Sequence, residues 1–181
     1  MENELNVLVA VRENGTALKD KLLNMGVSAD IFAGENTIWR CDASEQGGKV
    51  CLSFDEGAVL FFCDENAAAD FLYTVICHCL YLQMMTVDFG GMLGILDESS
   101  WDRCIRSTDW AQQEEIPFYT SVLSANVLPD VDDPEISFQY MNETDDLLME
   151  RFAEDSQIMM IFGEDVTQER RKLFWLEAAN V

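Results

Sequence analysis

The chain has 181 residues, of which 49 % are hydrophobic, and it carries 34 acidic against 11 basic side chains for a formal net charge of -23. This hydrophobic content excludes a disordered acidic tail and predicts a single folded domain over residues 1–181. Charge of this sign repels nucleic acid and anionic membranes. We therefore expect neither as a direct ligand, and expect a basic protein as the partner.

The first part of the chain predicts a strand, a short helix and then a set of strands. The expected strands are Leu5–Val11, Thr37–Cys41, Val50–Phe54 and Ala58–Cys63. Between the first two, Thr16 is the expected cap of a helix with an apolar stripe of Leu18, Leu22 and Met25, and Gly26 is its expected end. Short turns with glycine separate the later strands and favour an antiparallel meander.

The middle of the chain predicts one long helix. Asp64 is its expected N-cap, and the helix is expected to run over about residues 64–85. Its apolar residues occur almost all round, which suits a central helix packed across a sheet. A second helical segment is expected at Ser99–Ser107, followed by a strand at Phe118–Val127.

The last part predicts two further helices and two strands. Glu135–Met141 is an expected strand, and an acidic turn from Pro129 to Pro134 precedes it. The other expected elements are a helix capped by Thr144 and running through Phe152, a strand at Gln157–Phe162, and a terminal helix that Asp165 or Thr167 opens and that carries Arg170 to Leu176. The order of elements predicts an α+β fold, with a mainly antiparallel sheet packed by the central helix and shorter helices.

The N-terminal residues lack the basic and apolar regions of a secretory signal, so we expect a cytoplasmic protein, in the cytoplasm of a bacterial host. Its six cysteines are then expected to be reduced and to serve as small buried hydrophobic residues. They are Cys41, Cys51, Cys63, Cys77, Cys79 and Cys104.

Signals for catalysis and metal binding are weak. The single histidine, His78, lies between Cys77 and Cys79, and consecutive helical residues point about 100° apart, which does not suit metal ligation or a Cys–His pair. The glycine-rich segment Phe89–Gly94 lacks the Lys of a phosphate-binding loop, and Asp130–Glu135 lacks the central Gly of a calcium loop. We expect no enzyme activity, no metal and no cofactor.

The acidic residues are unevenly distributed. From Ser107 through Glu150 the chain has no Lys or Arg and 11 acidic residues. We expect the densest part of this stretch to bind a cationic surface, while capping and solubility are the structural alternative. The candidate partner-binding residues are Asp130, Asp132, Asp133, Glu135, Glu143, Asp145, Asp146 and Glu150.

In its size, its acidity and its lack of enzymatic motifs and of a signal sequence, the chain resembles the acidic inhibitors of phages and mobile elements, particularly anti-CRISPR proteins. The resemblance implies a non-enzymatic DNA mimic. Such a protein would bind the basic nucleic-acid-binding surface of a bacterial Cas nuclease, such as Cas9, and block DNA binding or cleavage.

Two alternatives stay open. An acidic immunity protein that neutralises a toxin nuclease would use the same carboxylates on another target. A small-molecule enzyme or a housekeeping binding domain would carry its acidity incidentally.

Overall fold

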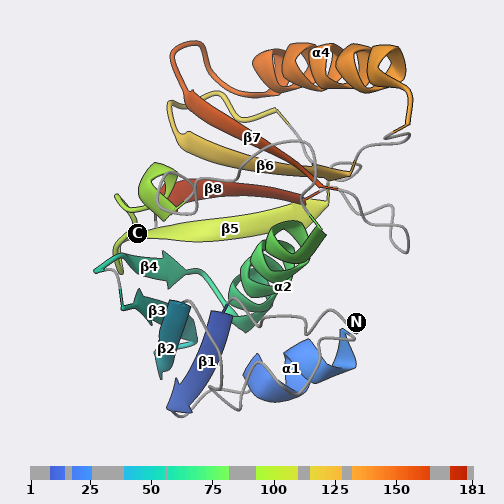
Figure 1. Ribbon diagram of the computed structural model, residues 1–181. Coiled ribbons are helices and arrows are strands. Elements are labelled where there is room, and N and C mark those ends of the chain that lie inside the picture. Colours follow the sequence, from blue (N-terminus) through green and yellow to red (C-terminus); the bar gives the residue numbers. More distant parts are fainter. Residues whose placement is uncertain are drawn as a thin grey trace, which may run out of the picture.

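The computed structural model describes residues 9–14, 18–25, 39–55, 57–81, 93–109, 115–127, 132–163 and 172–178. The helices whose bounds lie within these ranges are α1 (Leu18–Asn24), α2 (Glu65–Tyr81) and α4 (Pro134–Arg151), and residues 93–95 are also helical. The strands are β1 (Val9–Asn14), β2 (Trp39–Gln46), β3 (Lys49–Phe54), β4 (Val59–Phe62), β5 (Arg103–Asp109), β6 (Ser121–Val127), β7 (Gln157–Gly163) and β8 (Lys172–Ala178). The predicted α+β class is confirmed (Figure 1).

All the described strands form one sheet in the order β1-β2-β3-β4-β5-β8-β6-β7. Three neighbouring pairs are parallel, namely β1–β2, β4–β5 and β6–β7, so the sheet is mixed and the expectation of a mainly antiparallel sheet is wrong. The reason is that a helix follows the first strand of each parallel pair. A helical crossover returns the chain to the end of the sheet where it started, so the next strand runs parallel.

The predicted meander is confirmed for β2, β3 and β4, which pair antiparallel in chain order. The β2–β3 connection is a two-residue turn at Gly47 and Gly48, whose φ angles are 60° and 82°. Positive φ at both positions suits glycine and matches the twist of the strands that the turn joins. Here the local sequence was sufficient to set the pairing of Gln46 with Lys49.

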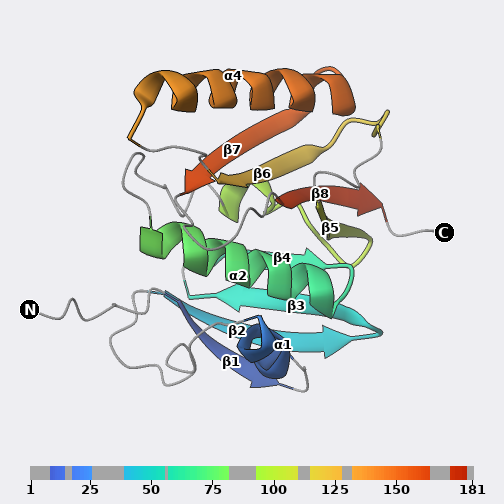
Figure 2. The same ribbon diagram turned by 90° about the vertical axis from the view of Figure 1, so that its right-hand side faces the viewer.

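The helix expected at 64–85 is present as α2 over Glu65–Tyr81, and residues 82–85 lie outside the described ranges. Asp64 caps this helix by accepting a hydrogen bond from the Ala67 backbone N–H at 2.8 Å. Together with α1 it covers one face of the sheet, and α4 lies apart from both at the β7 end (Figure 2). The helix therefore does not span the sheet as a central helix. It covers part of one face of the sheet, and α4, a helix of similar length, lies at the β7 end.

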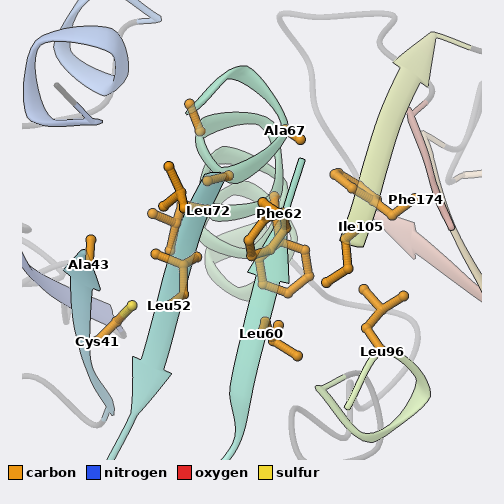
Figure 3. Close-up of a cluster of buried hydrophobic side chains, with 14 of the residues drawn as sticks. Cys41, Ala43, Leu52, Leu60, Phe62, Ala67, Leu72, Leu96, Ile105 and Phe174 are labelled. Atoms are coloured by element: carbon orange, nitrogen blue, oxygen red, sulfur yellow. The ribbon is translucent and has the colours of Figure 1, made fainter. Parts of the chain in front are cut away.

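The main core lies between this helical layer and the sheet, as Figure 3 shows. Its centre is aromatic, since the Phe71 ring lies 5.3 Å from that of Phe62 and 5.6 Å from that of Phe174. Twenty-one buried residues belong to this cluster, from both helices and six strands. Leu18 and Leu22 of α1 are among them and Met25 packs against them, which confirms the predicted stripe.

Residues 172–178 form a strand, so the helix predicted to extend through Leu176 is wrong at these positions. Phe174 and Leu176 belong to the main core, whereas Leu173 and Trp175 belong to a second cluster with Leu148 of α4. Successive residues of a strand point to opposite faces of a sheet. A strand buried on both faces reads as a continuous apolar run, which periodicity cannot distinguish from a helix.

The helix expected at Ser99–Ser107 is also wrong, because Arg103–Asp109 form β5. This strand pairs antiparallel with β8 along its whole length, and it pairs parallel with β4 at Ile105. The backbone hydrogen bonds that it makes come from strands distant in the sequence. Local propensity could not supply that information.

Candidate functional site

The helix α4 carries most of the acidic residues singled out from the sequence. The side chain of Asp133 accepts hydrogen bonds from the backbone N–H groups of Glu135 and Ile136, and Pro134 occupies the first turn. Both features favour helix initiation. The strand expected at Glu135–Met141 is therefore wrong. Thr144 does not cap a helix, because it lies buried in the middle of this one.

Ile136, Phe138 and Tyr140 alternate with other residues along the chain, a pattern typical of a half-buried strand. In the structure these residues lie on a helix, and Ile136 and Phe138 are exposed. The signal that indicates the helix is the pair Asp133–Pro134, which supplies an N-cap and then a residue without a backbone N–H. The sequence contained that signal, although the periodicity argued against it.

The inner face of α4 packs on the sheet through small and polar residues. Ser137, Thr144 and Leu148 are buried along it. Leu148 joins a cluster of six buried residues, which are Ile116, Val122, Leu148, Phe152, Leu173 and Trp175. Among the described atoms, the buried Trp175 Nε1 has no hydrogen-bond acceptor. The buried cluster that attaches α4 to the sheet is therefore smaller than the main core.

Seven of the eight candidate residues lie on α4 or immediately before it, and Asp130 lies outside the described residues. Rotation by about 100° per residue places Glu135, Glu143, Asp146 and Glu150 on the outer side, opposite the buried face. We call these four residues the acidic crest. Of the others, Asp133 is the N-cap, Asp132 precedes it, and Asp145 lies exposed on one flank of the helix.

The carboxylates of α4 differ from Asp42, Asp70, Asp109 and Glu177, which each contact a basic side chain. Within the described ranges, the structure shows no ion pair for any residue of the acidic crest. Glu143 accepts a hydrogen bond from the Gln139 side-chain amide at 2.8 Å, which leaves its charge in place. Ion pairs are found on other elements, for example Arg12 with Asp42 and Arg106 with Glu177.

Exposed apolar side chains gather on the same helix. Among the described residues, the large hydrophobic residues that are exposed are Leu23, Phe118, Tyr119, Ile136, Phe138, Leu147 and Met149. Four of these lie on α4, and two more lie just before β6. The segment before β6 meets the C-terminal end of α4, because the Ile116 N–H donates to the Arg151 carbonyl at 2.7 Å. Sequence reasoning missed this apolar surface, because Glu135–Met141 was predicted to be a strand.

A second polar cluster joins α2 to the sheet. The Lys172 ammonium lies 3.1 Å from an Asp70 carboxylate oxygen and 2.9 Å from Asp109, and the Ser107 hydroxyl donates to Asp70 at 2.8 Å. Lys172 is therefore paired with two carboxylates, one of which also accepts from Ser107. The cluster is a structural clamp between the helix and two strands.

The described cysteines, Cys41, Cys51, Cys63 and Cys104, are free thiols. Burial raises the pKa of Cys63 to about 12, and Coulombic attraction from Arg106 only partly opposes this. Burial also raises the pKa of Cys41. Since the thiolate is the reactive form, neither is a nucleophile near neutral pH. Cys77, His78 and Cys79 lie on α2, but their side chains are outside the described ones.

In the described part of the chain, no group of three or more His, Cys, Asp or Glu side chains is arranged to hold a metal ion. None of the helices described there has both the length and the apolar composition needed to cross a bilayer. Comparisons with protein-family models, curated proteins and solved structures gave no match to this chain.

Proposed function

We propose that this protein is a non-enzymatic inhibitor that binds the basic nucleic-acid-binding surface of a bacterial nuclease through α4. The observation that supports the proposal is the acidic crest, whose carboxylates are exposed and have no ion pair within the described residues. A row of free carboxylates on a rigid helix offers Lys and Arg side chains what a phosphate strand offers them. A Cas nuclease is the first target to test.

The spacing of the crest is compatible with this role. Glu143, Asp146 and Glu150 follow one another at intervals of three and four positions, so they lie in a row on one side of the helix. Carboxylates three or four positions apart repel each other and destabilise a helix slightly. A basic partner would relieve that repulsion, so the favourable electrostatic term would appear only in the complex.

The test is competition for DNA. Guide-loaded Cas9 with fluorescent target DNA would be titrated with the protein, and DNA release would be followed by anisotropy at several salt concentrations. We expect release by the wild-type protein that weakens as salt increases. The triple reversal Glu143→Lys, Asp146→Lys and Glu150→Lys should lower the association rate at least tenfold.

The matched control makes the same change of net charge elsewhere. Asp20, Glu45 and Asp55 are exposed on α1, on β2 and after β3. Reversal of these three to Lys should leave competition within about twofold of wild type, because their charges lie outside the proposed interface. Equal loss in the two triple variants would attribute the effect to net charge and would contradict a role for α4. Neutralisation of a toxin nuclease without any effect on Cas nucleases would favour the immunity alternative.

A further inference from the structure

The exposed apolar residues of α4 form two pairs with identical spacing. Phe138 and Met149 are eleven positions apart, which brings them to the same side of the helix about 16 Å apart along its axis. Ile136 and Leu147 have the same spacing on the other flank of the acidic crest. Phe138 and Met149 are each 64 % exposed, against 43 % and 37 % for the second pair, so the first flank is the more open to a partner.

The open flank combines apolar and acidic side chains in a fixed order around the helix. Asp145 lies on one side of the line from Phe138 to Met149, and Glu135 and Asp146 lie on the other. We call the line from Phe138 to Met149, with Asn142 between them, the apolar stripe. Carboxylates therefore border the stripe on both sides.

Further exposed apolar side chains lie on the segment that contacts the C-terminal end of α4. Ile116 forms a bridge with Phe152 directly after α4. Phe118 and Tyr119 follow Ile116 by two and three residues, and they are 44 % and 49 % exposed. Exposed apolar side chains on adjoining elements are candidates for an interaction surface.

We propose that the apolar stripe binds a cationic amphipathic helix of the partner protein. Such a helix has an apolar seam that would lie along Phe138 and Met149 over about three turns. Lys or Arg side chains on both sides of the seam would meet Asp145 on one border and Asp146 on the other. This inference rests on the proposed function, because it names the element of the basic surface that α4 would contact.

Charge favours a basic partner helix over a second copy of this chain or an anionic membrane. A second copy of the chain would bring two acidic crests together, and like charges at an interface cost several kcal/mol. An anionic membrane would be repelled in the same way. A partner helix with basic borders instead places opposite charges beside a contact that excludes water, where their interaction is stronger than at an open surface. The apolar anchors would then carry most of the affinity and the borders the specificity.

A pair of synthetic peptides tests the proposal without any nuclease. The first is an 18-residue peptide of Leu and Lys with its leucines at helical spacing, and the second has the same composition in scrambled order. Each would carry a fluorophore and be titrated with the protein at about 150 mM salt, where surface charge is largely screened beyond about 8 Å. We expect binding of the amphipathic peptide to be at least tenfold tighter than that of the scrambled one.

Two matched double variants then locate the site. Phe138→Ala with Met149→Ala should weaken binding of the amphipathic peptide at least tenfold, whereas Ile136→Ala with Leu147→Ala should stay within about twofold of wild type. All four side chains are exposed on one helix, so circular dichroism and thermal unfolding should show both variants folded. Equal effects of the two variants, or equal affinity for the two peptides, would overturn the proposal.

Self-association is measured in the same samples by sedimentation. A wild-type dimer that Phe138→Ala with Met149→Ala converts to a monomer would assign the stripe to a second copy and overturn the proposal. Nuclease inhibition is measured in a separate experiment. If the protein prefers the amphipathic peptide but inhibits no nuclease, the proposed function fails and the binding role of the apolar stripe stands. If it inhibits a nuclease but does not prefer the amphipathic peptide, only the binding role of the stripe is refuted.

Discussion

Asp70 and Asp146 are both acidic residues on helices, but their surroundings are opposite. Asp70 lies against the sheet, where it accepts from Ser107 and faces Lys172, and its side chain is 19 % exposed. Asp146 is exposed on the outer side of α4, beside other carboxylates and with no ion pair among the described residues. The first residue is part of the fold. Asp146 has no such contact among the described residues, so we expect its substitution to leave the fold intact.

The two helices differ in their attachment as well. The buried cluster that includes α2 contains 21 residues, and the cluster that includes α4 contains six. The smaller cluster also holds the Trp175 N–H, which has no acceptor among the described atoms. The helix α2 therefore packs in the main core, while α4 exposes its outer face at the β7 end of the sheet. Variants in each region test this division.

The largest expected effect concerns the two cores. Phe71→Ala removes the ring between Phe62 and Phe174 and should lower the free energy of unfolding by about 3–5 kcal/mol. Leu148→Ala should cost about 2 kcal/mol, near the lower limit for such changes, because a small cluster can partly collapse into the space. Urea unfolding measures both. An equal cost for Leu148→Ala would show that α4 is as deeply integrated as α2.

An intermediate effect is expected at the polar clamp. Asp70→Asn leaves the mostly buried Lys172 with only part of its charge compensation, and should lower stability by about 1.5–3 kcal/mol. Asp109→Asn is the matched control, because that side chain faces the same ammonium but is 51 % exposed. Its cost should stay below about 1 kcal/mol. Thermal or urea unfolding that ranks the two in the reverse order would contradict the assignment of Asp70 as the central residue.

The smallest effect has the opposite sign. Asp146→Asn removes repulsion with Glu143 and Glu150, so it should raise the free energy of unfolding by about 0.4–1 kcal/mol, the sum of two such helix pairs. Asp42→Asn breaks the exposed pair with Arg12 and should change stability little, because solvent screens an ion pair at the surface. A loss of stability in Asp146→Asn, measured by urea unfolding, would mean that the crest contributes to the fold.

Sequence reasoning succeeded where the determinants are local. The cap at Asp64, the stripe of α1 and the glycine turn before Lys49 each depend on residues only a few positions apart, and all three are present in the structure. It failed at Arg103–Asp109 and at Lys172–Ala178, where distant strands and two helical layers decide the state of the backbone. At Ile136–Tyr140 an alternating apolar pattern outweighed the cap signal of Asp133, and the error concealed the candidate binding surface.

The sequence by itself determined the net charge, the concentration of carboxylates between Asp132 and Glu150, and the turns and caps that depend on near neighbours. Only the tertiary structure decided which of those carboxylates share one side of a helix and which apolar residues accompany them. The reason is that exposure is a property of packing. Phe138 and Phe174 are chemically identical, and one is exposed while the other is buried because β8 lies between two helical layers and the outer side of α4 faces none in the described structure.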